Sequence, residues 1–390
     1  MPSPVFRPAW VEVDLEAVAH NVRLLAELVA PARLCAVVKA DGYGHGAPTV
    51  AQAALDGGAS LLAVALVEEG VALREAGIEA PVLLLSEPTP DGIAEAIARG
   101  LTLTCYTPSG LSSAVSAAER TGRRARVHLK VDTGMHRVGA EAEDLLDLAV
   151  AAAGEPALSL EGLWTHLAVA DEPEDGFTGV QLERFAATVA TVAAAGVRPG
   201  VRHAANTAGA IAFPKARLDL VRCGIGCYGY PPSADCGRIL HAALAGREGL
   251  RPALSLKARV HLVRELPAGE RTSYGRAYAL AKPGPVAVVP LGYHDGVARA
   301  LGAAGGEVLL GGVRRRLAGT VTMDQILVDC TDGPPVAPGD EAVLLGSQGH
   351  EAITAAEWAD RLGTIPYEIL CGIGPRVPRV PLGMAGASRR

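Results

Sequence analysis

The chain has 390 residues, and 36 lysines and arginines against 42 aspartates and glutamates give a formal net charge of -6. This small acidic excess, without a lysine- or arginine-rich stripe, argues against nucleic-acid binding. With 49% hydrophobic and 20% charged residues, the composition is that of a folded globular protein long enough for two domains.

The seven cysteines are scattered, odd in number and include no C-x-x-C pair. They are expected to be reduced packing residues, so the sequence predicts neither a disulfide framework nor a metal site. The N-terminal residues lack the basic and apolar regions of a signal peptide, and no apolar run approaches the roughly 18 residues of a membrane span. A cytoplasmic protein without a membrane partner is expected. The basic cluster Arg314–Arg316 is expected to lie in a solvated hairpin.

Strand-like and helix-like segments alternate through the first 230 residues. Trp10–Leu15 alternates like a short strand, and a helix that ends at Pro31 follows it. Beyond it, apolar runs recur, each separated from the next by residues with helical spacing. These expected strands are 34–38, 60–65, 82–85, 101–105, 126–131, 158–164, 201–205 and 218–221. Strand and helix alternation of this length predicts an α/β fold, a (β/α)8 TIM-like barrel, with an open doubly wound sheet as the alternative.

The placement of the unusual polar residues favours the barrel. They stand at the carboxyl ends of the expected strands, which is where the active sites of such barrels form. They are Lys39, Asp132–Arg137, His166, Asn206–Thr207 and Arg222.

From about residue 240 the pattern changes to short strand-like runs separated by turns rich in glycine and proline, with one helix near Thr354–Leu362. The sequence therefore predicts a barrel domain over residues 1–240 and a mostly β domain over 241–390. The first strand, Trp10–Leu15, can pair with the second domain.

Lys39 ends an apolar strand and directly precedes the glycine-rich turn Asp41–Gly46. An amine at this position either extends to water or has a lowered pKa and acts as a nucleophile. Glycines allow a close approach of the backbone to a ligand, and Tyr43 and His45 offer polar tips beside the amine. The stretch thus predicts a nucleophile and a ligand cradle in one unit.

Thr207 and Gly224–Gly226 follow the seventh and eighth expected strands, whose loops commonly bind phosphate in this fold. A tight turn is the alternative for the glycines. A reactive lysine together with a phosphate site suggests a Schiff base with pyridoxal phosphate.

A second polar stretch runs from Lys130 to Gly139. Its Arg137 can grip the carboxylate of an amino-acid substrate through two hydrogen bonds, or can pair with an acidic side chain of the same loop. Both His166 and Arg222 are consistent with a functional role and with burial in the core.

Taken in order, these motifs resemble the alanine racemase family, pyridoxal-phosphate enzymes that interconvert L- and D-alanine with a barrel domain and a C-terminal β domain. The resemblance runs from Trp10-Val11-Glu12-Val13-Asp14 to Pro366-Tyr367-Glu368. It implies an amino-acid racemase, a small-molecule amino-acid substrate and D-alanine for peptidoglycan as the product.

The resemblance also implies two catalytic bases. Lys39 forms the internal aldimine with the cofactor and is the base on the face of the D-enantiomer. Tyr274, in Ser273-Tyr274-Gly275, is the base for the L-enantiomer and comes from the partner subunit, so a homodimer with shared sites is expected. Two bases on opposite faces of a planar carbanion are what racemisation requires.

The remaining site residues follow from the same resemblance. Arg222 faces the pyridine nitrogen and His166 supports it, while Arg137 and the backbone N–H of the partner's Met323 bind the substrate carboxylate. Lys130 is at a position that can be carbamylated. The residues implied to bind the cofactor phosphate are Tyr43, Thr207, Gly224, Ile225 and Tyr367.

Three positions depart from the family pattern. Thr207 stands where serine is usual, Thr322 stands where many relatives have cysteine, and His294 stands where a small residue is common. They keep open a racemase with broadened or serine-shifted specificity.

Two other classes of protein, a decarboxylase and a cofactor carrier, agree less well with the sequence. A fold-related decarboxylase is expected to carry an acidic residue where Arg222 stands, and a non-catalytic cofactor carrier has no need of Tyr274 or of a second domain.

Overall fold

The computed structural model describes residues 6–383, which form two compact units. The first unit consists of residues 17–42 and 46–251. The second contains the N-terminal segment through Glu16, the short segment Tyr43–His45, and the chain from Pro252 onward. The chain changes unit several times near the N-terminus, and it enters the second unit for the last time between Arg251 and Pro252.

Parallel strands form a closed barrel in the first unit. In the described residues they are β2 (Arg33–Val37), β3 (Leu61–Val64), β4 (Val82–Leu84), β5 (Leu103–Cys105), β6 (Ala125–Lys130), β7 (Leu158–Trp164), β8 (Val201–His203) and β9 (Leu220–Cys223). β2 pairs with both β3 and β9, and ladders join β3 to β4 and β5 through β8. Leu83 bridges Thr102 between β4 and β5, and the Arg222 N–H donates to the Ala205 carbonyl oxygen just beyond β8 at 2.9 Å. The predicted barrel is confirmed, and the open sheet is excluded.

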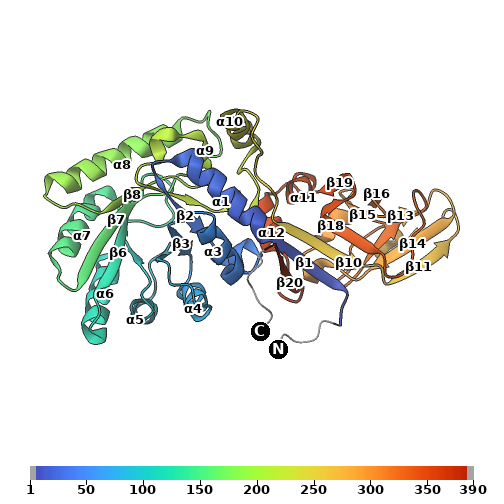
Figure 1. The fold of residues 1–390 in the computed structure, drawn as a ribbon, viewed down its shortest axis with the longest axis horizontal. Coiled ribbons are helices and arrows are strands. Elements are labelled where there is room, and N and C mark those ends of the chain that lie inside the picture. The colour runs from blue at the N-terminus through green and yellow to red at the C-terminus, as the bar shows by residue number, and fades with distance from the viewer. Residues whose placement is uncertain (1–5, 384–390) are drawn as a thin grey trace. The chain divides into compact units, whose positions relative to one another are not determined.

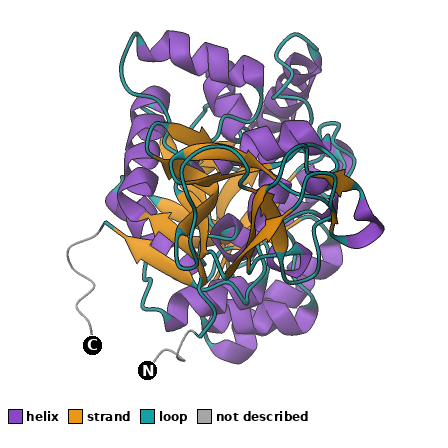
Figure 2. Cartoon of the chain, turned by 90° about the vertical axis from the view of Figure 1, so that its right-hand side faces the viewer, coloured by secondary structure: helices purple, strands orange, loops and turns teal. Residues whose placement is uncertain are grey.

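Helices connect successive strands and surround the barrel (Figures 1 and 2). Several begin at side-chain caps, such as Thr89, Thr107 and Ser233, which satisfy free N–H groups of the first helical turn. The helices of this part are α1 (Leu15–Val29), α3 (Ala47–Asp56), α4 (Val67–Glu75), α5 (Pro90–Ala98), α6 (Pro108–Thr121), α7 (Ala142–Gly154), α8 (Phe177–Ala194), α9 (Thr207–Ala212) and α10 (Ala234–Leu244).

The second unit is built mainly from antiparallel sheets. Its largest sheet has the order β16-β15-β18-β10-β1-β20, with β19 added to β18, and a smaller sheet has the order β11-β14-β17. β1 pairs with β10 in antiparallel register, with Val11 opposite Leu256. The strands of this unit are β1 (Ala9–Asp14), β10 (Leu254–Arg259), β11 (Leu262–Leu266), β12 (Arg271–Thr272), β13 (Tyr278–Ala279), β14 (Gly284–Val289), β15 (Glu307–Leu310), β16 (Val313–Arg316), β17 (Ile326–Asp329), β18 (Glu341–Gln348), β19 (Glu351–Ile353) and β20 (Arg379–Leu382).

Short helices complete the two units. Near the expected helix 354–362 the second unit has α11 (Ala355–Leu362), and α12 (Pro366–Cys371) follows it. The remaining helical turns are α2 (Lys39–Tyr43), η1 (Pro214–Ala216), η2 (Ile225–Tyr228), η3 (Tyr274–Arg276), η4 (Tyr293–Asp295) and η5 (Arg299–Gly302).

The basic cluster lies in the hairpin of β15 and β16, but it is not fully solvated as expected. Arg315 is only 4% exposed. Its guanidinium donates to the carbonyl oxygens of Leu310, Asp332 and Pro334 at 2.9, 2.6 and 2.6 Å. These carbonyl acceptors replace water, so the charge tolerates burial.

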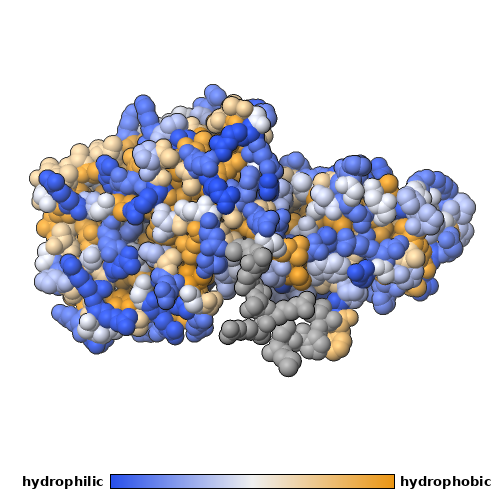
Figure 3. Space-filling view, in the orientation of Figure 1, coloured by the Kyte–Doolittle hydropathy of each residue, from blue (hydrophilic) through white to orange (hydrophobic). Residues whose placement is uncertain are grey.

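No helix among residues 6–383 combines the length and the apolar character needed to cross a bilayer. In the same residues no group of histidine, cysteine and acidic side chains is arranged to hold a metal ion. Hydrophilic and hydrophobic side chains are interspersed on the face shown in Figure 3.

Candidate active site

Lys39 follows β2 after one residue, Val38, and opens a turn of left-handed backbone. Ala40, Asp41 and Gly42 have φ angles of 53°, 53° and 62°. A left-handed conformation costs a non-glycine residue roughly 1–2 kcal/mol, so it persists only where its surroundings hold it. The half-buried Lys39 is thereby attached to a backbone of fixed direction.

Three hydrogen bonds hold this turn. The Gly42 N–H donates to the Val38 carbonyl oxygen at 2.9 Å. The Ala40 N–H donates to Oε1 of Glu69 at 2.6 Å, and Asp41 Oδ1 accepts from the Ala47 N–H at 2.8 Å. The two carboxylates thus compensate for a backbone conformation that alanine and aspartate rarely adopt.

Two buried cations contact the same aromatic ring inside the barrel. Lys130 Nζ lies 4.3 Å from the ring centroid of Trp164, and Arg222 Cζ lies 4.5 Å from it. Each cationic side chain is only 3% exposed. Cation–π contact partly offsets the loss of hydration of these groups.

The pKa of Lys130 falls from 10.5 to about 7, first because the amine is buried and then because Arg222 and Arg137 lie near it. Lys39 lowers it further, which places Lys39 in the same cluster of positive charge. Among the described residues no side chain or carbonyl accepts a hydrogen bond from Lys130 Nζ. A large fraction of Lys130 is therefore a neutral amine near neutral pH.

Arg222 is surrounded by neutral acceptors. Nη1 donates to Nδ1 of His203 at 2.8 Å, and Nη2 donates to Nδ1 of His166 at 3.1 Å. Nη2 also donates to the carbonyl oxygens of Thr165 and Ala204, both at 2.9 Å. Burial lowers the pKa of Arg222 to about 10, so the guanidinium stays charged at neutral pH.

His166 is held in its neutral form beside this guanidinium. Its pKa is lowered well below its ordinary value, first by burial and then by Arg222. Because its Nδ1 accepts from Arg222, its proton is on Nε2. Arg222 thus sets the orientation of His166, and burial together with Arg222 keeps the ring neutral.

The loop after β6 carries Arg137. Asp132 Oδ1 accepts from the N–H groups of Gly134 and Met135 at 2.8 and 2.9 Å, which folds the loop back. An added Cβ at Gly139 would lie 2.7 Å from the Asp132 nitrogen, so the tight return requires glycine there. The exposed Arg137 has no carboxylate partner among the described residues, so the ion pair considered for this loop is absent.

Thr207 and the glycine loop lie side by side in the barrel. The Gly224 N–H donates to Thr207 Oγ1 at 2.9 Å. An added Cβ at Gly226 would lie 2.8 Å from Thr207 Cγ2, so this close approach depends on glycine. The Asn206 side chain caps α9 by accepting from the Gly209 N–H at 2.9 Å, which fixes the start of the helix that carries Thr207.

Tyr43 and Tyr367 are brought together within the second unit, with ring centroids 6.0 Å apart. The glycine between Tyr43 and His45 has a structural reason that differs from the expected ligand approach. An added Cβ at Gly44 would lie 2.4 Å from the Leu370 carbonyl oxygen. Gly44 is therefore required by chain packing.

Tyr274 and Met323 are exposed in the second unit, by 72% and 52% of their surfaces. The backbone near Tyr274 is nevertheless fixed. Ser273 Oγ donates to the Thr320 carbonyl oxygen at 2.6 Å, and Thr320 Oγ1 donates to the Tyr274 carbonyl oxygen at 3.0 Å. The Tyr274 side chain is thus exposed to solvent on a turn whose backbone is held by hydrogen bonds.

The structure adds residues that sequence reasoning missed. Trp164 and His203 end β7 and β8, so the rule that selected His166 could have found them. Gln181 of α8 is fully buried, and its Nε2 donates to Thr133 Oγ1 at 3.1 Å and to the His166 carbonyl oxygen at 3.0 Å. Its position in a helix gave no signal of this role.

A closed parallel barrel with a lysine at the carboxyl end of its first strand, linked to a β unit, defines a barrel-type enzyme with an accessory β domain. Family models for the alanine racemase N-terminal domain and C-terminal domain match residues 13–232 and 253–381. The chain belongs to the alanine racemase family. The resemblance found in the sequence and the predicted isomerase class are thereby confirmed.

Individual relatives agree with this assignment. An alanine racemase from Symbiobacterium thermophilum is 47% identical over 373 residues, covering 96% of this chain and 97% of the relative. The alanine racemase structure from a D-cycloserine-producing Streptomyces lavendulae has a TM-score of 0.90 at 40% identity and covers 98% of both chains. A histidine racemase from Leuconostoc mesenteroides is also similar, with a TM-score of 0.87 at 28% identity, covering 97% of this chain and 99% of that one.

Proposed function

We propose that this protein is a pyridoxal-phosphate-dependent alanine racemase that interconverts L- and D-alanine. The observation that carries the proposal is the cluster of Lys39, Lys130, Arg137 and Arg222 at one end of the barrel. Asp132, the acid that acts on Lys130, accepts hydrogen bonds from backbone N–H groups. Such a cluster lacks compensating negative charge, which a phosphate and a substrate carboxylate would supply.

The donor set fits pyridoxal phosphate. Lys39 offers the amine, Thr207 and the Gly224–Gly226 loop offer a hydroxyl beside closely packed backbone, and Arg222 offers a fixed guanidinium. Gly224, Ile225, Tyr43 and Tyr367 complete the proposed phosphate site. When bound, the cofactor supplies the electron sink that makes the substrate α-proton acidic.

Arg222 sets how strong that sink is. A guanidinium at the pyridine nitrogen does not give up a proton, because its pKa remains near 10 even when buried. His166, neutral and turned toward Arg222 through Nδ1, holds the guanidinium in place. A charged guanidinium in this place would leave the pyridine nitrogen of the bound cofactor unprotonated, which would limit charge build-up on the ring and disfavour side reactions.

Two groups are proposed to move the α-proton. Lys39 takes it from the face of D-alanine and Tyr274 from the face of L-alanine, and each returns a proton on its own face. In the proposed homodimer Tyr274 and the Met323 N–H come from the partner subunit. This assignment gives a reason for the exposure of both side chains in the single chain.

Arg137 is proposed to bind the substrate carboxylate, since its guanidinium has no carboxylate partner among the described residues. Lys130 is proposed to be carbamylated and to orient Arg137. A neutral amine attacks carbon dioxide with loss of one proton and becomes an anion, and the lowered pKa of Lys130 supplies that neutral form. ¹³C-bicarbonate should give a protein carbonyl resonance that Lys130→Met abolishes.

We further propose that the enzyme works in the cytoplasm and supplies D-alanine for peptidoglycan. Cysteine chemistry supports the first part. In the described part of the chain the seven cysteines are free, and six of them are buried. Unpaired cysteines of this number suit a reducing compartment.

The decisive experiment offers the purified holoenzyme L-alanine and L-serine separately in heavy water. Proton NMR follows α-deuteration, and chiral chromatography follows formation of the D-enantiomer. We expect deuterated D-alanine to form faster than D-serine. Faster turnover of serine would replace alanine with a serine-shifted specificity, and exchange of neither α-proton would overturn the racemase proposal.

A further inference from the structure

A cavity of about 330 Å³ lies at the end of the barrel where the strands begin. Four of its lining residues are the first residues of their strands: Arg33 of β2, Leu61 of β3, Val201 of β8 and Leu220 of β9. The residues of the candidate active site follow the opposite, carboxyl ends of the barrel strands. The cavity is thus a separate feature of the same unit.

The cavity has an excess of positive charge. Arg33 and Arg126 line it together with one acid, Glu161. Arg126 Nε is paired with both carboxylate oxygens of Glu161 at 2.9 Å. Arg33 has no ion-pair partner among the described residues, and the nearby Asp219 is engaged by Arg202 at 2.8 Å. Arg33 lies close enough to Asp219 to help lower the pKa of that carboxyl, but it forms no ion pair with it. The exposed Arg33 guanidinium is therefore the cation of the cavity that is not held in an ion pair among the described residues.

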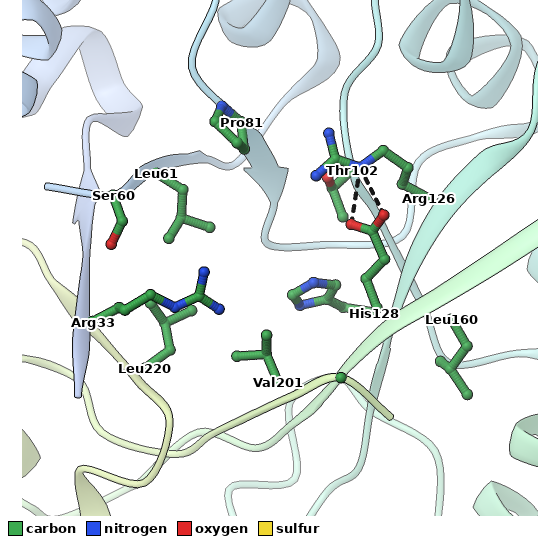
Figure 4. A pocket seen from close by; sticks show the side chains of 12 residues that line it. Arg33, Ser60, Leu61, Pro81, Thr102, Arg126, His128, Leu160, Val201 and Leu220 are labelled. Carbon is green, nitrogen blue, oxygen red and sulfur yellow. Dashed lines mark hydrogen bonds and ion pairs between the residues drawn. The ribbon is translucent and has the colours of Figure 1, made fainter. Parts of the chain in front are cut away.

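A third donor comes from His128, whose ring lies between the two arginines in Figure 4. Arg222 donates to Nδ1 of His203, so the His203 proton is on Nε2. That nitrogen lies 3.0 Å from Nδ1 of His128, which must accept. His128 is therefore neutral with its proton on Nε2, in agreement with the lowering of its pKa to about 3 by burial.

The ring of His128 is held in this orientation by its surroundings. An added Cβ at Gly162 would lie 2.5 Å from His128 Nδ1, so the ring packs directly on the β7 backbone. With Nδ1 engaged inside the barrel, the Nε2–H is the remaining donor of the residue. Arg33, Arg126 and His128 together offer N–H groups and no free acceptor.

We propose that this cavity binds a small organic or inorganic oxyanion, a carboxylate or a phosphate, between the Arg33 guanidinium and the Nε2–H of His128. Guanidinium groups match both kinds of anion through paired hydrogen bonds. A volume of about 330 Å³ is at the lower end for small-molecule sites. The ligand balances the charge that Glu161 leaves uncompensated.

Stability alone does not account for this arrangement. Polar residues at this end of a barrel usually serve stability, and Arg126 does so through its ion pair with Glu161. Arg33 gains no such partner, although its side chain points across the cavity toward His128 (Figure 4). A cation directed into a space lined by further hydrogen-bond donors creates a positive potential there, which attracts an anion.

Calorimetric titration of the holoenzyme tests the proposal, with inorganic phosphate in one series and acetate in another. The variants are Arg33→Gln and, as a matched control, Arg120→Gln, which changes an exposed arginine of α6 outside the cavity. We expect Arg33→Gln to weaken anion binding by about tenfold or more and Arg120→Gln to change it less than about twofold. Arg33→Lys, which keeps the charge but not the planar fork, is expected to lie between them and covers the case of a poorly folded Arg33→Gln.

Histidine ¹⁵N NMR locates the bound anion, because a ligand on His128 shifts the resonance of its protonated nitrogen. Tighter binding of phosphate than of acetate assigns the site to phosphate compounds, and the reverse order assigns it to carboxylates. Binding that Arg33→Gln leaves unchanged, or no binding of either probe up to about 10 mM, overturns the proposal.

Discussion

Arg222 Nη1 donates a hydrogen bond to Nδ1 of His203 at 2.8 Å inside the barrel. The His203 ring also stacks on Trp164, with centroids 5.4 Å apart and planes inclined by 9°. The pKa of His203 is lowered well below its ordinary value by burial and then by Arg222, so the ring is a neutral acceptor. The direction of the Arg222 guanidinium is therefore set by an imidazole that cannot move freely.

Removing that acceptor should loosen Arg222. His203→Phe keeps an aromatic ring but leaves the buried donor Arg222 Nη1 unsatisfied, at a cost of about 1–3 kcal/mol in the free energy of unfolding. We expect kcat to fall by about tenfold, because Arg222 is no longer held. His203→Asn, whose Oδ1 can accept in place of Nδ1, should recover much of kcat. Equal kcat for wild type and His203→Phe, measured beside urea unfolding, would contradict this positioning role.

Lys39→Ala should abolish the visible absorbance of enzyme-bound cofactor, since the proposed covalent attachment point is lost. Borohydride reduction of the wild type followed by peptide mass spectrometry should place the cofactor on Lys39. Lys215→Ala, which removes an exposed lysine of η1, is the control and should keep the absorbance. Retention of the band in Lys39→Ala would exclude the assignment.

Tyr274→Phe should slow α-proton removal from L-alanine by about 10²- to 10⁴-fold, the usual contribution of a general base. Cofactor content should be unchanged, because Tyr274 is exposed and its turn is held by Ser273 and Thr320. Deuterium exchange from each enantiomer measures the effect. Tyr278→Phe, whose hydroxyl donates to Asp329 in the same unit, is the control. A normal rate with L-alanine in Tyr274→Phe would remove the tyrosine from the mechanism.

The lowered pKa of Lys130 makes stability depend on pH. In the folded chain this pKa is about 7, against 10.5 for an unperturbed lysine. Between these values the unfolded chain binds more protons, so the free energy of unfolding rises with pH by up to about 1.4 kcal/mol per unit. Below pH 7 Lys130 is protonated in both the folded and the unfolded chain, so its contribution no longer changes with pH.

Lys130→Met should remove that dependence. We expect urea unfolding between pH 7 and 9, in buffers free of carbon dioxide, to show a steeper rise for wild type than for Lys130→Met. Lys215→Met, at an exposed site, should follow the wild type. Parallel curves for wild type and Lys130→Met would mean that Lys130 stays charged in the folded chain.

Asp295 is fully buried in the second unit between two arginines. Its Oδ1 accepts from Arg7 Nη1 and Arg376 Nε, both at 2.6 Å, and Oδ2 accepts from the Gly292 N–H at 2.8 Å. Burial raises its pKa, but these hydrogen bonds outweigh burial and leave the pKa below the usual 3.8. The carboxylate thus stabilises the unit above that pH, and the contribution is lost as pH falls through the lowered pKa.

Asp295→Asn should therefore lower the free energy of unfolding at pH 7 by about 3 kcal/mol, because two guanidiniums lose their shared partner. The difference from wild type should shrink as the pH falls below about 3.8. Asp324→Asn removes an exposed partner of Arg376 and should cost less than about 1 kcal/mol. Urea unfolding at pH 7 and below about pH 3.8 measures these free energies. Equal losses of stability in Asp295→Asn and Asp324→Asn at pH 7 would contradict a stabilising role of the buried Asp295 carboxylate.

Much of the barrel could be predicted from local pattern. The expected strand 158–164 coincides with β7, and the other barrel strands agree closely with the runs expected. Parallel barrel strands are buried on both faces, so they are continuous apolar runs that a sequence reveals directly. Their polar end residues could be recognised for the same reason.

The geometry of the site was less accessible. The left-handed conformation of Ala40 and Asp41 had no glycine to signal it, because Glu69 and the Asp41 side chain itself supply the stabilising hydrogen bonds. The pairing of Val11 with Leu256 joins segments far apart in the chain. Neither a propensity nor a spacing encodes such contacts.

The sequence by itself determined the kind of enzyme, because Lys39, Thr207, Arg222 and Tyr274 occur in a recognisable order within a readable barrel pattern. Only the tertiary structure decided how these groups act on one another. Barrel closure brings Lys130 and Arg222 onto Trp164, from three different strands. Burial there makes Lys130 partly neutral and leaves Arg222 charged, because desolvation and neighbouring charges depend on long-range packing that no local run of residues contains.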